Sequence, residues 1–379
     1  MTYRGAILIF SFFLLVQSGY GYDVKDLEKI IEKGETEKVW TLISKIPTDL
    51  EGKDRKKVID LLRDALFREW SRCAGDLRQV IANKLSALNA KEAVPDFLEL
   101  IKKEMSIDHE CAQCGCCFVS WSVKDELEVA MEPDFFCENG LLAALFDMAT
   151  FSYSKEISEL ADRNQNYRPQ LLVTLGKIGH PRYAHFISKF AGSEDPQTRQ
   201  AVAHGLGLIK QPAGVRALGM LLEDSQEYIR WTASKSLLEI GGEKAREVLK
   251  LKLMQSDKNI QVLAARTLAK MDINEGRLKL RELAKDTDSK IRKIAIAYLG
   301  QIGDMDSKEI ILQGLDDKSD LVRVYSIYAL GYVGNSGDIP AIKKCLAETK
   351  EMNSSEDGGL ELLDGTVDDA IKQIKSTGE

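Results

Sequence analysis

The residues of this sequence that could do chemistry lie mostly in one short segment rich in cysteine. The segment contains His109, Cys111, Cys114, Cys116, Cys117 and Cys137. Four thiolate or imidazole groups are the usual ligands of a structural Zn²⁺ ion. In an oxidising compartment the same cysteines would form disulfides instead. The spacing therefore leaves three alternatives open: two disulfides, a metal site or a redox-active centre.

Motifs of several enzyme classes are absent from the sequence. It has no Gly-x-Ser-x-Gly, no His-Glu-x-x-His and no phosphate-binding Gly-Lys loop. The pair Cys111 and Cys114 lacks the βαβ context of a thioredoxin, and Gly115 stands where covalent haem attachment needs a histidine. We therefore assign no catalytic residue, expect that the chain is not an enzyme, and consider zinc as the one candidate cofactor.

Residues 1–21 have the pattern of a secretory signal peptide. An apolar run from Ala6 to Val16 follows Arg4, and Gly19 and Gly21 suit a cleavage site. The run is shorter than the ~20 residues that cross a bilayer, so we favour a cleaved signal over a retained anchor. We expect an exported mature chain, periplasmic or extracellular, without a membrane span.

The overall charge bears on the choice of partner. The chain has 59 acidic against 52 basic residues, a formal net charge of −7, and no basic tail. Phosphate binding needs clustered lysine and arginine, so this balance argues against nucleic acid. The partner that we expect is a protein or a peptide.

The elements that must position these residues follow a period of 31 residues. One column of the repeat is apolar and a second, seven positions earlier, is mostly arginine. The columns are Leu175, Leu206, Leu237, Leu268, Leu299 and Leu330, and Arg168, Arg199, Arg230, Gln261, Arg292 and Arg323. A later apolar column contains Ile187, Leu218, Leu249, Leu280, Ile311 and Ile342. Apolar residues at helical spacing predict two amphipathic helices per period.

Polar residues and glycines recur at fixed places in the period. Short polar residues four positions before the arginine column suit helix N-caps: Asn164, Asp195, Asp257, Asp288 and Ser319. Glycines on the arginine helix, such as Gly207 and Gly300, predict close approach of neighbouring helices. The arginines could bind a charged ligand or link adjacent units. We favour linkage, because a residue present in nearly every unit serves the array.

The stretch from Asp288 to Gly303, with Ile291, Arg292 and Leu299 at its characteristic positions, resembles the HEAT-like repeat of the phycobilisome-lyase type. The resemblance covers about residues 164–348, with an extra copy at about 74–103. It implies an all-α fold, a right-handed α-solenoid of helix pairs used mainly for protein binding. It does not imply lyase activity, because one fold serves many functions.

If the arginine-bearing helices line the concave side, as the resemblance implies, each presents one stripe outward. The stripe includes His204, Trp231, Lys235, Arg266, Lys270, Lys293, Tyr328 and Tyr332. Aromatic and arginine side chains are frequent anchors of protein interfaces, so the stripe predicts a partner-binding groove. The alternative is that the aromatic rings pack on neighbouring helices and the lysines face water.

These observations divide the chain into six segments. They are the signal peptide 1–21, an N-terminal helical cap 22–72, a first repeat 73–103, an irregular cysteine-containing insertion 104–163, the 31-residue repeats 164–348, and an acidic linker with a C-terminal capping helix 349–379. We expect that capping helix over residues 367–375. Cys345 occupies an apolar position of the last repeat, which predicts a buried free thiol.

Overall fold

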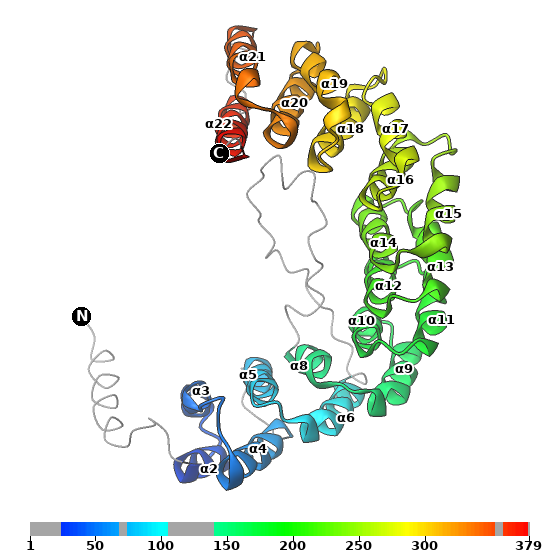
Figure 1. The fold of residues 1–379 in the computed structure, drawn as a ribbon. Helices are drawn as coiled ribbons and strands as arrows, with labels where there is room; N and C mark the ends of the chain where they lie inside the picture. Colours follow the sequence, from blue (N-terminus) through cyan, green and yellow to red (C-terminus); the bar gives the residue numbers. More distant parts are fainter. Residues whose placement is uncertain (1–23, 68–73, 105–139, 353–358, 378–379) are drawn as a thin grey trace, which may run out of the picture. The chain divides into compact units, whose positions relative to one another are not determined.

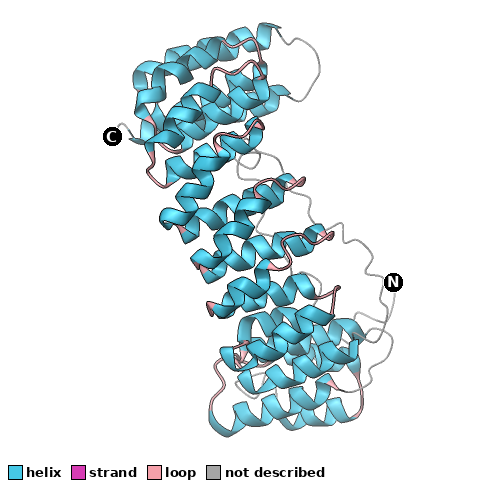
Figure 2. Cartoon of the chain, turned by 90° about the vertical axis from the view of Figure 1, so that its right-hand side faces the viewer, coloured by secondary structure: helices cyan, strands magenta, loops and turns pink. Residues whose placement is uncertain are grey.

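A computed structural model describes residues 24–67, 74–104, 140–352 and 359–377 (Figure 1). Helices and short turns make up these residues, and no strand occurs among them (Figure 2). None of the described helices combines the length and the apolar character needed to span a membrane. The described residues divide into two compact units, 24–180 and 181–377.

The N-terminal unit contains eight described α-helices. They are α2 (Val24–Glu32), α3 (Thr36–Lys45), α4 (Gly52–Leu66), α5 (Ala74–Ala87), α6 (Val94–Glu104), α8 (Gly140–Met148), α9 (Ser154–Arg163) and α10 (Arg168–Ile178). α5 packs against α3, α4 and α8, and α8 also contacts α6 and α10. The unit therefore has a continuous core in which helices distant in sequence are neighbours.

The C-terminal unit consists of alternating first and second helices of the 31-residue repeat. The first helices are α12 (Pro196–Ile209), α14 (Glu227–Ile240), α16 (Lys258–Lys270), α18 (Ser289–Gln301) and α20 (Asp320–Val333). The second helices are α11 (Arg182–Ser188), α13 (Val215–Leu221), α15 (Gly242–Lys252), α17 (Asn274–Leu283), α19 (Lys308–Gln313) and α21 (Ile339–Met352). A last helix, α22 (Gly359–Thr377), packs on α20 and α21.

Two rows of helices result. Each first helix contacts the next one along the chain, from α12 to α20, and we call these five helices the first-helix row. The second helices, the second-helix row, lie on the other side of the same unit (Figure 1). Within this unit, Figure 1 shows the first-helix row on the inner side of the bend.

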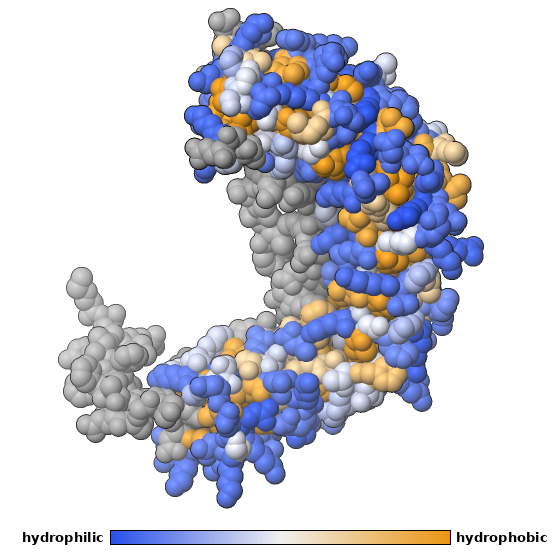
Figure 3. Space-filling model, in the orientation of Figure 1, coloured by the Kyte–Doolittle hydropathy of each residue, from blue (hydrophilic) through white to orange (hydrophobic). Residues whose placement is uncertain are grey.

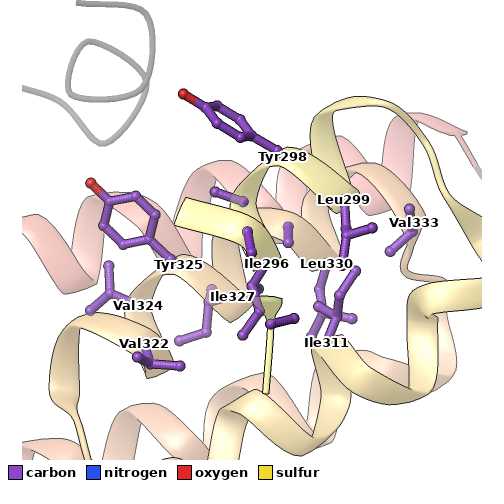
Figure 4. Packing of buried hydrophobic residues seen from close by; sticks show 14 of the residues in the cluster. Ile296, Tyr298, Leu299, Ile311, Val322, Val324, Tyr325, Ile327, Leu330 and Val333 are labelled. Carbon is purple, nitrogen blue, oxygen red and sulfur yellow. The ribbon is translucent and has the colours of Figure 1, made fainter. Parts of the chain in front are cut away.

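The periodic apolar residues form the core between the rows. Every leucine of the first column and every residue of the second apolar column is at most 1% exposed. Figure 4 shows Leu299, Ile311 and Leu330 meeting between α18, α19 and α20. On the visible surface of this unit, hydrophilic residues alternate with separate apolar patches (Figure 3). The prediction of two amphipathic helices per period is confirmed.

Glycine allows the first helices to approach closely, as predicted. A Cβ atom on Gly300 would lie 2.5 Å from Ala329 Cα, and one on Gly207 would lie 2.3 Å from Ser236 Oγ. Real side-chain atoms do not come this close, so a larger residue would force α18 away from α20. The spacing within the first-helix row therefore depends on these glycines.

Two segments differ from the sequence-based prediction. Residues 140–163, placed within the irregular insertion, form α8 and α9. α8 is apolar on almost every side because α5, α6 and α10 surround it, so it lacks the amphipathic spacing that identifies a surface helix. The C-terminal helix spans Gly359–Thr377 instead of 367–375, and Leu363, Val367, Ala370 and Ile374 form its buried stripe.

Candidate partner-binding surface on the first-helix row

The first-helix row carries all eight residues of the predicted stripe, but their exposure differs. Lys270 and Tyr332 are exposed, whereas Arg266 is only 4% exposed. The others are half-buried: His204, Trp231, Lys235, Lys293 and Tyr328. The prediction that all of them face outward is therefore wrong for Arg266.

Arg266 is buried because two aromatic rings enclose its guanidinium group. The group lies 5.0 Å from the ring centre of Trp231 on α14 and 4.8 Å from that of Tyr298 on α18. A desolvated cation over an aromatic face is attracted by the ring quadrupole, typically by ~2 kcal/mol. This stack joins three consecutive first helices and fixes the orientation of the half-buried Trp231.

The buried N–H groups of this stack differ in their partners. Arg266 Nε is buried and forms no hydrogen bond among the described residues, whereas Trp231 Nε1 interacts with the Tyr298 hydroxyl without ideal hydrogen-bond geometry. Burial raises the pKa of the Tyr298 hydroxyl, and the nearby Arg266 charge acts in the opposite direction to a smaller extent. Tyr298 therefore stays protonated and uncharged at neutral pH.

A second aromatic group lies on α18 and α20. Gln301 Nε2 donates to the Tyr328 hydroxyl at 3.2 Å, and the hydroxyls of Tyr328 and Tyr332 are 2.9 Å apart. Lys293 Nζ lies 4.9 Å from the Tyr325 ring centre. In Figure 4 the rings of Tyr298 and Tyr325 both extend away from the leucine core.

The sequence-based stripe did not include Tyr298 and Tyr325. Their columns in the repeat hold small or aliphatic residues in the other first helices, for example Gly205 and Ala201 in α12. An aromatic residue in such a column was the signal for both. It could not be interpreted without knowing which side chain of the neighbouring helix lies opposite.

Two arginines of the column, Arg199 and Arg292, link adjacent repeats through aspartates, which confirms the predicted structural role at these positions. Arg199 Nη1 donates to the carbonyl oxygens of Ser193 and Glu194 in its own turn, at 2.9 and 3.0 Å. Its Nε and Nη2 donate to the Asp224 carboxylate of the next turn, at 2.6 and 3.1 Å. Asp224 is therefore held by a bidentate ion pair between two units.

Arg292 repeats this arrangement three repeats later. Its Nη1 donates to the carbonyls of Asp286 and Thr287, and its Nε and Nη2 donate to Asp317, both at 2.8 Å. Burial raises the pKa of Asp317, but hydrogen bonds from Arg292 and from the Ser319 amide outweigh this effect and hold the pKa below its ordinary value. The same opposition, with Arg199 and the Gln226 amide, lowers the pKa of Asp224.

The predicted helix caps are confirmed at three of five positions. Asp195, Asp257 and Asp288 accept hydrogen bonds from backbone N–H groups at the starts of α12, α16 and α18. Ser319 precedes α20 but its side chain makes no capping bond. Asn164 instead accepts from the amides of Asn166 and Tyr167, because α10 begins only at Arg168.

The predicted cysteine site lies outside the described residues. This applies to His109 and to all five of the clustered cysteines, Cys111, Cys114, Cys116, Cys117 and Cys137. Within the part of the chain that the structure describes, no group of three or more His, Cys, Asp or Glu side chains could hold a metal ion. Cys345 is a free thiol, 3% exposed, as predicted.

Two rows of paired helices with a shared core define an all-α solenoid. The HEAT-repeat model matches residues 155–238, 183–269, 251–331 and 278–353, which together extend over more than half of the chain. The chain belongs to the HEAT-repeat family. Among curated proteins, no sequence matches it.

Several solved structures are similar to the chain at low sequence identity. An engineered protein is 19% identical, with 93% of this chain and 99% of that chain covered and a TM-score of 0.37. The CpcE–CpcF phycocyanin lyase complex from Nostoc sp. PCC7120 is 15% identical, with 86% and 98% covered and a TM-score of 0.31. Kap121p is 10% identical, with 93% and 46% covered and a TM-score of 0.49.

Proposed function

We propose that this HEAT-repeat chain is an exported, non-enzymatic scaffold that binds a protein or peptide partner along the first-helix row. The observation that carries the proposal is the set of aromatic and cationic side chains on α14 to α20. Trp231, Tyr328 and Tyr332 are half-buried or exposed and are held by neighbouring side chains. Rigid aromatic side chains with positive neighbours are the usual anchors of protein interfaces.

Site-specific photo-crosslinking tests this surface. A benzophenone-bearing amino acid is placed at Trp231 or Tyr332 on the first-helix row, with controls at Arg216 and Met254. Both control residues are exposed and lie on or directly after second helices, and Met254 is 85% exposed. Irradiation is carried out in the protein's own compartment, and the adducts are identified by mass spectrometry.

The proposal predicts that one partner is joined to both first-row positions and to neither control. Equal adducts at all four positions would indicate nonspecific contact. Adducts at the control positions alone would assign the partner to the second-helix row and contradict the proposal.

Export is supported by the apolar run from Ala6 to Val16 and the small residues that follow it. N-terminal sequencing of the protein secreted or recovered from the periplasm tests this step. A mature N-terminus near residue 22 is the expected result, whereas an intact first residue on cytoplasmic protein would contradict export.

The cysteine segment supports a second candidate function, a metal-binding or redox module carried by the solenoid. Its basis is the sequence alone, with five cysteines and His109 within residues 109–137. Metal analysis combined with thiol counting on native protein separates the alternatives. Stoichiometric zinc with reduced thiols favours the metal module, and absence of metal with one or two free thiols favours disulfides.

A further inference from the structure

We call the arginine–aspartate ion pairs between adjacent repeats, Arg199–Asp224 and Arg292–Asp317, the ion-pair ladder. Arg230 has no such aspartate partner, and we call this the gap in the ladder. In Arg199 and Arg292, the Nε–Nη2 edge binds an aspartate that lies 25 positions later. The residue 25 positions after Arg230 is Gln255, which cannot supply a carboxylate. Gln255 Nε2 donates instead to Glu223. The missing ion pair at Arg230 therefore follows directly from the sequence, which has no carboxylate at position 255.

Arg230 nevertheless forms the same Nη1 hydrogen bonds to its own turn as Arg199 and Arg292 do. Its Nη1 donates to the carbonyl oxygens of Asp224 and Ser225, at 2.8 and 3.2 Å. Among the described residues, no group accepts a hydrogen bond from its Nε or Nη2. A guanidinium group oriented by two carbonyls and open along its other edge is preorganised for one bidentate anion.

A shallow hollow lies next to this arginine on the first-helix row. Its lining includes Arg230 and Trp231 from α14, Asn259 from α16, and Ile294 and Tyr298 from α18. The Asn259 side chain is exposed, and its side-chain amide forms no hydrogen bond among the described residues; only the backbone amide is bonded, to Asp257. Apolar rings beside oriented polar groups are the composition expected of a side-chain subsite.

The buried groups beneath the hollow indicate the charge of the ligand that would bind there. Arg266 Nε is buried and has no hydrogen-bond partner among the described residues, and its guanidinium lies over the Trp231 ring. The Arg266 guanidinium is therefore a donor with a positive charge, and the aromatic rings of Trp231 and Tyr298 lie close to it. An acceptor with negative charge is the complementary ligand.

We propose that this hollow binds an acidic side chain of the partner, with the carboxylate paired to the Nε–Nη2 edge of Arg230. The carboxylate takes the place that Asp224 and Asp317 occupy beside Arg199 and Arg292, and an apolar neighbour in the partner packs on Trp231. This inference rests on the proposed function and names the chemistry that the first-helix row recognises.

The charge balance of the hollow favours a carboxylate over a phosphate. Glu227 also lines it, is exposed, and forms no ion pair among the described residues. A single exposed carboxylate repels a monoanion weakly in water but acts about twice as strongly on a phosphate dianion. The partner residue that we assign is therefore aspartate or glutamate, and a phosphorylated residue is an outcome that the test can return.

Selection of random peptides displayed on phage tests the inference with the full chain. Four proteins are used in parallel: wild type, Arg230→Gln, Gln255→Asp and Arg216→Gln. Arg216 is an exposed arginine on α13 and serves as the matched control. Gln255→Asp keeps Arg230 but supplies an internal carboxylate, so it closes the site without removing the arginine.

The expected result is enrichment of peptides with an acidic residue beside an apolar one on wild type and Arg216→Gln. Arg230→Gln and Gln255→Asp should each lose that enrichment, and a synthetic peptide of the enriched sequence should bind them about tenfold or more weakly. Glu227→Gln should bind the same peptide more tightly than wild type, because one repulsive charge is removed.

Other outcomes overturn the inference or the function in separable ways. Peptides enriched on all four proteins without an acidic preference would overturn the carboxylate site and leave the protein-binding function standing. An acidic preference that survives in both Arg230→Gln and Gln255→Asp would do the same. Tighter binding of a phosphorylated version of the peptide would replace the carboxylate with a phosphate. Failure of wild type to enrich any peptide would overturn both proposals.

Discussion

Replacing Gln255 with aspartate should stabilise the C-terminal unit, because it adds an ion pair to Arg230 like those that Arg199 and Arg292 form. Arg230 already forms the Nη1 hydrogen bonds that orient Arg199 and Arg292. In those two residues Nε and Nη2 lie 2.6–3.1 Å from aspartate oxygens. Asp317 Oδ1 also accepts from the amide two residues later, at 2.9 Å, and an aspartate at 255 would do the same with Asp257. The new carboxylate would enter a site arranged to receive it.

The expected gain is about 1–2 kcal/mol. A hydrogen bond to a charged group is worth ~1.5–3 kcal/mol when partly buried, and the solvent exposure of this turn reduces the sum. Loss of the exposed hydrogen bond from Gln255 to Glu223 subtracts less than about 1 kcal/mol. For a unit of this size the net gain corresponds to a rise in Tm of roughly 2–8 °C.

Thermal and urea unfolding followed by far-ultraviolet circular dichroism measure the effect. Gln255→Asn is the matched control, because it has the size of aspartate without the charge. In the double variant with Arg230→Gln the gain from aspartate should vanish. If Gln255→Asn stabilises as much as Gln255→Asp, or if the gain persists without Arg230, the ion-pair reasoning is refuted.

Three further predictions follow from the same contacts. Gly300→Ala should lower the free energy of unfolding by about 1–3 kcal/mol in a urea titration, because its Cβ would meet Ala329, whereas Gly192→Ala has open space and should change it little. The pKa values of Asp224 and Asp317 are depressed in the folded state. Their contribution to the free energy of unfolding is therefore complete above the unfolded pKa of about 4 and is lost as pH falls through the folded pKa values. In an acid titration, Asp317→Asn should lose less stability than wild type. Burial raises the pKa of the Cys345 thiol, which donates to Leu315 O at 3.4 Å, so a disulfide-exchange reagent should modify it only upon unfolding, and rapid reaction of native protein would contradict its burial.

The sequence was sufficient to predict the rows of helices and their core. A leucine that recurs every 31 residues, such as Leu237 or Leu299, has to be buried in each unit if it is buried in one. The caps at Asp195 and Asp288 follow from local backbone chemistry, which depends on only a few neighbouring residues. These features could be predicted because each is set within one repeat.

Features that depend on two neighbouring repeats were harder to predict. Arg266 has the sequence position of an outward residue, but Trp231 and Tyr298 come from the helices on either side and enclose it. Helical spacing within α16 contains no information about those rings. The helix α8 was not predicted for a related reason: it packs on α5, α6 and α10, so it lacks the broad polar face that periodicity detects.

The gap at Gln255 lies between these cases. The substitution is visible in the sequence, where Gln255 occupies the column of Asp224, Asp286 and Asp317. Its meaning depends on knowing that an arginine pairs with the residue 25 positions later, which the structure shows at Arg199 and Arg292. A break in a repeated interaction can thus be recognised only after the interaction itself has been identified.

A charge exchange between Arg230 and its ligand tests the central claim most directly. The peptide selected on wild type is synthesised with its acidic residue unchanged or replaced by lysine, and both forms are titrated against wild type and Arg230→Glu by fluorescence anisotropy. We predict that Arg230→Glu loses the acidic peptide and gains affinity for the lysine form, with Arg216→Glu behaving as wild type. Equal affinities of Arg230→Glu for the two peptides would contradict recognition of a carboxylate by Arg230.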